Sequence, residues 1–224
     1  MSIYIIGAGG VGSWLAHAMC KLADPHDITI VDGDTLEKKN LDRQLFTEGD
    51  IGRNKADALA AHLECSYVDE WYSPYMVKHS PHDWIFCCVD NSPSRLECLK
   101  SCDMYECKCI VAANETTSSE AYLYLPAWRG IHHLDPRCYY PELLSNKAGH
   151  PAQAAAGCTG EAQQQNRQLV TANFIAAALA GHLFVVWAME ARKLKPETKA
   201  SLPNRLNQNL TRNNFALRGE EKNK

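Results

Sequence analysis

A glycine-rich turn near the start of the sequence is the first feature that indicates chemistry. Residues 7–12 read Gly-Ala-Gly-Gly-Val-Gly and fit the pattern G-x-G-x-x-G. Glycines here permit a tight turn and let a phosphate approach the backbone N–H groups at a helix start. Asp32 ends the next apolar run, twenty residues after Gly12, where a carboxylate can accept hydrogen bonds from ribose hydroxyls. We therefore predict an adenosine-nucleotide site, and this motif alone leaves NAD, FAD, S-adenosylmethionine and ATP open.

The elements that must position this turn alternate between short apolar runs and helical patterns, which indicates a parallel sheet. Residues 120–125 alternate in polarity, as an antiparallel strand does. We predict the α/β class, with a Rossmann-like, mostly parallel sheet, helices on both faces and an antiparallel C-terminal extension. The expected parallel strands are 3–6, 27–31, 66–68, 84–89 and 108–112, and the expected helices are 12–22, 55–63 and 92–104, the last capped by Asn91 or Ser92.

The last third of the sequence is less regular. Residues 128–160 are rich in Gly, Pro and His, and we expect a long functional loop there. A long helix or a broken pair of helices is expected at 161–194, and a hairpin at 204–217. The apolar run 174–191 has about the minimum length for a membrane span. We expect a buried helix instead, because the run contains two polar residues and lies in an α/β domain.

Length, charge and cysteine content limit the class of protein. The 224 residues suffice for one domain, which we place at 1–218, with a charged tail at 219–224. A net charge of −3 gives no general attraction to nucleic acid or to a membrane, so neither partner is expected. The N-terminal residues lack a secretory signal pattern, which predicts a cytoplasmic location and reduced thiols. The ten cysteines include no C-x-x-C pair, so structural zinc is not expected and most are predicted to pack in the interior.

Four further blocks distinguish between the nucleotides. They are D-x-D at 32–34, N-x-x-R-Q at 40–44, D-x-G-x-x-K-A at 50–56 and D-N at 90–91. Together with the glycine turn, and in this order, they resemble the ThiF/MoeB/HesA family, the bacterial relatives of ubiquitin-activating enzymes. Residues 50–57 and the pair Gln168 and Asn173 are also similar to the small ThiF proteins of bacterial mobile-element clusters, some of which encode a candidate ubiquitin-like protein.

The resemblance implies an activity and a role for each matched residue. The implied activity is an ATP- and Mg²⁺-dependent adenylyltransferase that acts as a homodimer. It would join the C-terminal carboxylate of a small ubiquitin-like or sulfur-carrier protein to the α-phosphate of ATP. The implied site comprises Gly7, Gly9, Gly10 and Gly12 as the phosphate loop, Asp32 at the ribose with Asp34 nearby, Asn40, Arg43, Gln44 and Lys55 at the triphosphate, and Asp90 at Mg²⁺.

These residue types suit that reaction. The attacking carboxylate is already ionised at pH 7, so no general base is needed. The barrier lies in the charge crowded around phosphorus and in orientation, and cations together with positioning should supply most of the catalysis. Arg43, Lys55 and a Mg²⁺ ion held by Asp90 are the expected catalytic groups.

Three departures from the family pattern lead to further expectations. MoeB-like members carry an arginine on an N-terminal helix that reaches ATP across the dimer, and we expect Arg129 or Arg167 to replace it. The paired zinc-binding C-x-x-C motifs of MoeB and ThiF are absent, and Cys138 is a candidate remnant. Many relatives form a thioester or a persulfide on a cysteine that precedes a long helix. Cys158 has that place in the sequence and is the candidate catalytic thiol, since a helix N-terminus lowers a thiol pKa.

Other functions remain open at this point. An NAD(P)-dependent oxidoreductase would use the glycine turn and Asp32 but would leave Arg43, Lys55 and Asp90 without roles. A non-catalytic partner subunit of an activating complex would explain a missing N-terminal arginine, although such subunits usually lose the phosphate-binding residues. Within the same adenylation chemistry, the acceptor could be a peptide terminus or a carboxylate on a modified tRNA.

Overall fold

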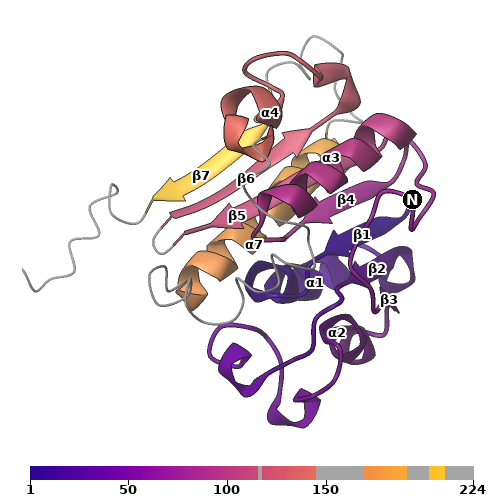
Figure 1. Ribbon diagram of the computed structural model, residues 1–224, viewed down its shortest axis with the longest axis vertical. Helices are drawn as coiled ribbons and strands as arrows, with labels where there is room; N and C mark the ends of the chain where they lie inside the picture. The colour runs from indigo at the N-terminus through magenta and orange to yellow at the C-terminus, as the bar shows by residue number, and fades with distance from the viewer. Residues whose placement is uncertain (116–117, 145–168, 191–201, 210–224) are drawn as a thin grey trace, which may run out of the picture.

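One sheet of seven strands organises the part of the chain that the structure describes (Figure 1). The computed structural model describes residues 1–115, 118–144, 169–190 and 202–209. The strands are β1 (Ile3–Ile6), β2 (Ile28–Val31), β3 (Ser66–Val68), β4 (Trp84–Cys87), β5 (Lys108–Asn114), β6 (Ser118–Tyr124) and β7 (Arg205–Asn209). The α-helices are α1 (Gly10–Leu22), α2 (Lys55–Leu63), α3 (Ser92–Tyr105), α4 (Pro136–Tyr139) and α7 (Val170–Phe184), and a π-helical turn, η7 (Val185–Glu190), continues α7.

The strand order places a crevice beside β1. The order is β3-β2-β1-β4-β5-β6-β7, and the first five strands in this order are parallel whereas β6 and β7 are antiparallel to their neighbours. The chain leaves β1 toward β2 and β3 and later returns to place β4 on the other side of β1. In open α/β sheets, ligands bind at the carboxyl ends of the strands where the order reverses in this way. The crevice expected here lies between the ends of β1 and β4.

Alternate residues of each central strand face two different helical layers. In β4, Trp84 and Phe86 pack in a core cluster with α1, α2 and α7, whereas Ile85 and Cys87 pack in a second cluster beneath α3. Figure 1 shows α3 crossing one face of the sheet and α7 crossing the other. A strand covered on both faces needs a continuous apolar run, which is what the sequence has. The predicted fold class, with helices on both faces and an antiparallel extension, is confirmed.

Helix α7 accounts for the long apolar run. It packs on α1, β5 and β6, and its buried residues recur every three or four positions, as on one face of a helix. By length and composition alone, the segment Val170–Ala188 is suited to cross a membrane, but its buried face identifies a core helix in this fold. The buried residues of α7 are Ala172, Asn173, Ala176, Ala177, Ala180, Gly181, Leu183 and Phe184.

A few predicted boundaries need correction. The first helix begins at Gly10 rather than Gly12, with Gly9 as its N-cap. The loop over residues 33–54 contains two 3₁₀ turns, η2 (Lys38–Asn40) and η3 (Glu48–Asp50). The part of the predicted 204–217 hairpin that is described is β7, which pairs with β6. Residues 161–168 and 191–194 of the long predicted helix, residues 210–217 of the hairpin and the charged tail 219–224 lie outside the described residues.

Candidate functional site

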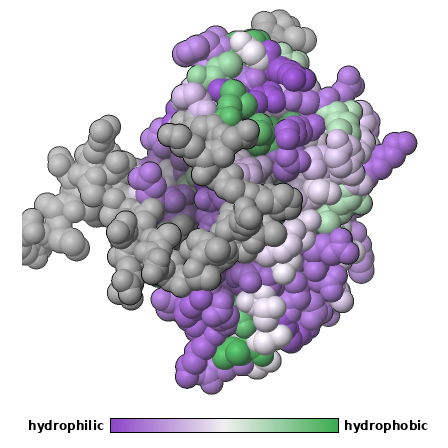
Figure 2. Space-filling view, in the orientation of Figure 1, coloured by the Kyte–Doolittle hydropathy of each residue, from purple (hydrophilic) through white to green (hydrophobic). Residues whose placement is uncertain are grey.

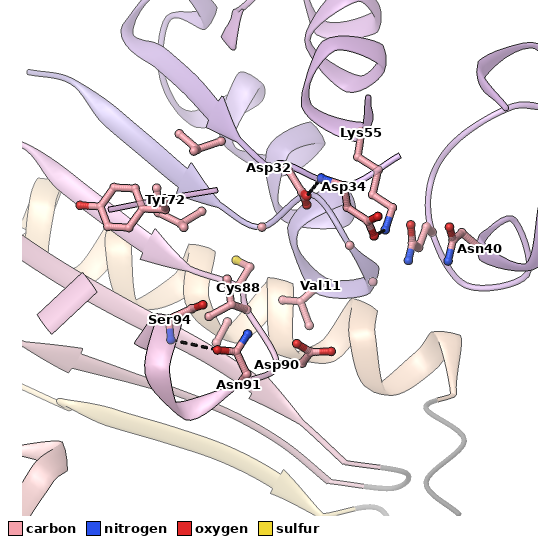
Figure 3. A pocket seen from close by; sticks show the side chains of 18 of the residues that line it. Val11, Asp32, Asp34, Asn40, Lys55, Tyr72, Cys88, Asp90, Asn91 and Ser94 are labelled. Carbon is pink, nitrogen blue, oxygen red and sulfur yellow. Dashed lines mark hydrogen bonds and ion pairs between the residues drawn. The ribbon is translucent and has the colours of Figure 1, made fainter. Parts of the chain in front are cut away.

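A cavity of about 230 Å³ opens where the carboxyl ends of β1, β2 and β4 meet the first turn of α1. In Figure 3, Asp34 and Lys55 lie on one side of this cavity, and Asp90 and Asn91 lie on the other. The face of the molecule seen in Figure 2 is mostly hydrophilic, with small separate hydrophobic patches. The lining includes the predicted site residues Gly7, Gly9, Gly10, Asp32, Asp34, Asn40, Arg43, Gln44, Lys55 and Asp90.

The glycine turn needs glycine for two different reasons. Gly7 has a φ of +93°, which L side chains rarely adopt, and its N–H donates to the carbonyl oxygen of Val31 at 2.8 Å. Gly12 is not part of the cavity lining. A Cβ at Gly12 would lie 1.8 Å from the carbonyl oxygen of Gly7, so this glycine permits α1 to pack closely on the turn. The structure thus gives Gly12 a packing role, and its place in the phosphate loop stays a prediction.

The N-terminus of α1 is prepared for an anion. Its N-cap, Gly9, offers no side-chain hydrogen bond, and its first turn contains no acidic residue. The first N–H groups of a helix have no intrahelical partner and carry the positive end of the helix dipole. Gly9, Gly10 and Val11 line the cavity, so these donors are in place for a phosphate.

Two buried amide oxygens beside this turn have no hydrogen-bond partner among the residues that the structure describes. They are Oε1 of Gln44, which lines the cavity, and Oδ1 of Asn173 on α7. Asn173 packs directly against the turn, because a Cβ at Gly10 would lie 2.5 Å from its Nδ2. The same Nδ2 donates to the carbonyl oxygen of Arg43 at 3.4 Å. Unpaired buried polar atoms are uncommon, and of these two only the Gln44 amide lines the cavity.

Asp32 is held at the end of β2 by two backbone donors. Its Oδ2 accepts from the N–H of Ala8 at 2.6 Å, and its Oδ1 accepts from the N–H of Asp34 at 2.8 Å. Burial raises the pKa of this carboxyl above its usual value, although the charge of Lys55 and the two N–H donors act in the opposite direction. The position beside the glycine turn is the one that a ribose-binding carboxylate requires.

Lys55 brings a buried ammonium group to the cavity from the first residue of α2. The residue is 6% exposed, and its Nζ forms an ion pair with the carboxylate of Asp34. Asn54 caps α2 by accepting from the N–H groups of Ala56 and Asp57. The Asn54 Nδ2 also donates to the carbonyl oxygen of Asp32 at 2.8 Å. One helix cap thus fixes the place of Lys55 relative to Asp32.

The loop between β2 and α2 supplies the N-x-x-R-Q residues. Asn40 is buried and closes a turn by accepting from the N–H of Glu37 at 3.0 Å. Arg43 Nη1 lies 3.7 Å from the Asp42 carboxylate, which is beyond hydrogen-bond distance. Both side chains line the cavity, where amide and guanidinium donors can contact phosphate oxygens.

Asp90 stands opposite, after the end of β4. Its side chain is exposed to the cavity, and its position is fixed by the start of the following helix. Asn91 caps α3 by accepting from the N–H of Ser94 at 2.9 Å, which confirms Asn91 as the predicted cap. Among the described residues, no group of three or more His, Cys, Asp or Glu side chains is arranged to hold a metal ion.

Sequence reasoning missed residues that reach the cavity from other segments. Trp71 and Tyr72, between β3 and β4, line it, and so does Arg95 on α3. Arg95 also lines a second groove of about 510 Å³, and its Nε donates to the carbonyl oxygen of Val89 at 3.1 Å. The two spaces share Arg95 and Asn114, so they are neighbours along the sheet. Of these three residues, only Arg95 could have been found from the sequence, because it follows the D-N block by four residues.

Several other predicted site residues are not found at the cavity. Arg129 lies 3.6 Å from the carboxylate of Asp103 and does not line the cavity of its own chain, so its predicted contact with ATP across a dimer stays a prediction. Arg129 follows the 3₁₀ turn η4 (Pro126–Trp128). This turn comes after β6, and because β6 runs antiparallel to β5, its end lies at the edge of the sheet opposite to the cavity. Cys138 lies on α4 and is half-buried. Cys158 and Arg167 lie outside the described residues.

The described cysteines are mostly interior residues. Cys87 and Cys88 are buried, as predicted, together with four others. Cys107 and Cys102 are 3.6 Å apart at sulfur, and burial raises the pKa of the Cys102 thiol well above its usual value. These are features of packing residues rather than of reactive thiols.

Comparison with known proteins gives one family. The ThiF family model matches residues 1–224. The chain is 32% identical over 109 aligned residues to the NEDD8-activating enzyme E1 catalytic subunit of Caenorhabditis elegans. The match covers 42% of this chain and 24% of that protein. It is 30% identical over 102 residues to the adenylyltransferase and sulfurtransferase UBA4 of Yarrowia lipolytica, which is 42% of this chain and 26% of that protein. It is 27% identical over 113 residues to the tRNA threonylcarbamoyladenosine dehydratase of Haemophilus influenzae, which is 45% of this chain and 42% of that protein.

Solved structures share the fold. The crystal structure of E. coli MccB with MccA-N7isoASN has a TM-score of 0.65 at 20% identity, covering 92% of this chain and 60% of that one. The crystal structure of E. coli MccB with ATP has a TM-score of 0.58 at 20% identity, covering 83% of this chain and 55% of that one. The chain thus spans less than half the length of these curated relatives and about three fifths of the solved chains.

Proposed function

Because the chain belongs to the ThiF family, we propose that it is an ATP- and Mg²⁺-dependent adenylyltransferase. Its substrate in this proposal is the C-terminal carboxylate of a small ubiquitin-like or sulfur-carrier protein. The observation that carries the proposal is the gathering of Arg43, Lys55 and Asp90 around one cavity, next to the glycine turn and Asp32. An oxidoreductase would have no use for these two cations and the exposed carboxylate.

The cavity suits a nucleotide triphosphate. The N–H groups at the start of α1, which have no intrahelical partner, lie beside its phosphate edge. A Cβ at Gly10 would lie 2.5 Å from Nδ2 of Asn173, so glycine at this position lets α7 pack closely against the turn. We assign the ribose to Asp32 and the phosphates to the α1 N-terminus, Asn40, Arg43 and Lys55.

Asp90 is the residue that would hold Mg²⁺. Magnesium is usually bound by one or two carboxylates together with substrate phosphates and waters, so a single exposed carboxylate facing the phosphate site fits this ion. When bound, Mg²⁺ would neutralise charge on the phosphate oxygens. A set of protein ligands large enough to form a closed cage is not needed for this role.

The residues of the cavity can then carry out adenylation. The acceptor carboxylate oxygen forms a bond to the α-phosphorus, and the bond from that phosphorus to the bridging oxygen of pyrophosphate breaks. The electron pair of the broken bond leaves with pyrophosphate, and no proton is transferred. The guanidinium of Arg43 and the ammonium of Lys55 stabilise the charge that builds up on the phosphate oxygens. The ion pair with Asp34 holds the ammonium in a fixed position before ATP arrives.

The second groove gives the acceptor a route to the α-phosphate. It runs from Arg95 and Asn114 over the antiparallel strands toward β7. Hydroxyl and amide side chains line much of it, including Ser118, Asn207 and Gln208. Such groups can hydrogen-bond to an extended backbone that has no large side chains. A flexible carrier terminus would present a backbone of this kind. Arg95 stands where the two spaces meet and can attract the terminal carboxylate.

ATP–pyrophosphate exchange in the presence of a small ubiquitin-like or sulfur-carrier protein tests the proposal. Arg43→Ala and Asp90→Ala are expected to reduce the exchange rate by roughly 100-fold or more, because each removes charge stabilisation from the transition state. Lys38→Ala removes an exposed cation on η2 and serves as the matched control. If Arg43→Ala and Asp90→Ala both exchange at the wild-type rate, the assigned mechanism is wrong.

Two further experiments identify the acceptor and test a transfer step that follows adenylation. A carrier with its terminal residues removed, a free peptide and a tRNA replace the intact carrier in turn, and only an intact carrier terminus is expected to support exchange. We extend the proposal to transfer of the acyl group to Cys158, on the ground of its place in the sequence. In this step the thiolate sulfur forms a bond to the acyl carbon of the adenylate, the bond from that carbon to the phosphate oxygen breaks, and AMP leaves with the electron pair. Cys158→Ala should then leave exchange intact and abolish any carrier adduct that a thiol reagent releases. NAD binding without ATP binding would favour the oxidoreductase.

A further inference from the structure

An exposed tryptophan covers the strand end that carries the ribose-binding carboxylate. Trp71 is 46% exposed and lines the nucleotide cavity. It comes three residues after the end of β3, whose last carbonyl oxygen accepts from the N–H of Asp32 at 3.2 Å. Large apolar side chains in a polar cavity require an explanation, and neither the family blocks nor the proposed chemistry uses this one.

Contacts with Gly33 show how the indole is oriented. A Cβ at Gly33 would lie 2.8 Å from Cδ2 and 2.9 Å from Cε2 of Trp71. These two carbons are shared by both rings of the indole, so Gly33 lies against the face of the ring system rather than against its edge. With one face against the backbone of Gly33, the exposed surface of the ring is directed away from the strand end. The glycine between Asp32 and Asp34 is what permits this approach.

The next residue fixes the segment that carries the tryptophan. Tyr72 is 8% exposed, and its hydroxyl donates to Oγ of Ser101 at 2.7 Å and lies 3.0 Å from Nε2 of His79. Because the Tyr72 proton is used toward Ser101, the His79 Nε2–H donates to Tyr72, which makes this ring nitrogen the protonated one. The hydroxyl of Ser101 donates in turn to the carbonyl oxygen of Glu97. A chain of buried hydrogen bonds therefore anchors the segment to α3.

We propose that Trp71 is the stacking platform for the nucleotide base. This inference rests on the proposed function in that it takes the bound ligand to be a nucleotide whose ribose is held by Asp32. Asp32 and Trp71 line the same cavity, and every base has a flat π-face that can stack on an indole. The larger purine ring covers more of the indole than a pyrimidine does. The platform therefore selects purine over pyrimidine nucleotides.

Binding experiments with the intact chain separate base contacts from phosphate contacts. ATP, CTP, NAD and inorganic tripolyphosphate are titrated by calorimetry into wild type, Trp71→Ala and Trp71→Phe. Trp71→Ala should weaken ATP binding roughly 5- to 100-fold, as alanine substitution of a stacking aromatic does, and leave tripolyphosphate binding unchanged. Trp71→Phe should retain most of the affinity. Tyr75→Ala is the matched control, since Tyr75 is an 80% exposed aromatic of the same segment outside the cavity lining.

The outcomes for this platform and for the adenylyltransferase can be told apart. Unchanged ATP binding by Trp71→Ala, or an equal loss for ATP and tripolyphosphate, overturns the platform even when wild type catalyses ATP–pyrophosphate exchange. Equal affinity of wild type for ATP and CTP overturns the purine selection. Wild type that binds NAD but not ATP, with NAD binding weakened by Trp71→Ala, overturns the adenylyltransferase and supports the platform. Wild type that binds none of these ligands overturns both.

Discussion

Asp32 shows how a single side chain serves the fold and the ligand together. Its two oxygens accept from backbone N–H groups in the glycine turn and in its own loop, so the carboxylate joins the ends of β1 and β2. Each carboxylate oxygen has a second lone pair that remains for a ribose hydroxyl. Burial raises its pKa, so this carboxyl takes up a proton at a higher pH than an exposed aspartate does.

That raised pKa predicts a pH dependence of nucleotide binding. Ribose hydroxyls donate to the ionised carboxylate, so the contribution of Asp32 to ATP affinity is full at neutral pH and is lost as the pH falls through the raised pKa. Asp32→Asn should weaken ATP binding roughly tenfold at pH 7.5. The ratio of the two dissociation constants should then approach one on acidification, at a pH above the ordinary value of 3.8.

Comparing the two proteins cancels the protonation of ATP itself, which affects both equally. Asp27→Asn, a change at an exposed aspartate of the 3₁₀ turn η1 (Pro25–Asp27), is the control and should leave the profile unchanged. A ratio that stays constant from pH 7.5 to pH 4.5 would remove Asp32 from ribose binding.

At the scale of elements, the close approach of α1 to the end of β1 is the feature most easily broken. A methyl group at Gly12 would lie 1.8 Å from a backbone oxygen, and backbone atoms cannot move aside as a flexible side chain does. We expect Gly12→Ala to lower the free energy of unfolding by roughly 3 kcal/mol or more, and to shift α1 away from the turn.

Urea denaturation measures this loss. Gly49→Ala is the matched control, because a Cβ there would meet only Thr47 Oγ1 at 3.7 Å, and its stability should change by less than about 1 kcal/mol. Wild-type stability in Gly12→Ala would mean that the helix is not held against the turn as described.

The sequence predicts those parts of the fold and of the site that have a local residue pattern. The strand β4 and its faces follow from a continuous apolar run, and Arg43, Lys55 and Asp90 were recognised in family blocks at the ends of elements. Trp71 carries no motif, and it reaches the cavity only because β3 pairs with β2. Local patterns do not encode which segment crosses which strand end. The approach of Arg129 to Asp103 on α3 likewise depends on packing between distant segments and has no local signal.

At the scale of the whole molecule, buried aspartates hold distant segments together. Asp83 accepts from the N–H groups of Ser2 and Ser80, each at 2.8 Å, and so joins the N-terminus to the start of β4. Asp135 accepts from Gly130 N–H and from the guanidinium of Arg137, which also contacts Asp103 on α3. These hydrogen bonds to the charged form lower the pKa of Asp83 and of Asp135, although burial alone would raise both.

A lowered pKa predicts loss of stability in acid. The contribution of such a carboxylate is present above the unfolded value of about 3.8 and disappears as the pH falls through the lower folded value. Asp83→Asn should reduce the free energy of unfolding by about 1–3 kcal/mol at pH 7, and the deficit should shrink below about pH 4. Urea denaturation between pH 7 and pH 3 checks this, with Asp27→Asn as the exposed control. A deficit that persists undiminished at pH 3 would contradict the assignment.

The contact between Asn173 on α7 and Gly10 has a consequence for the synthesis of the protein. All the family blocks have been translated once residue 91 is reached, but the helix that supports the phosphate turn follows only after residue 169. A nascent chain shorter than this has the nucleotide-binding motifs without the element that packs behind them. Contacts so distant in sequence form late. We therefore expect ATP to stabilise the nascent chain only after α7 has been translated, so that nucleotide does not assist the folding of the residues that precede this helix.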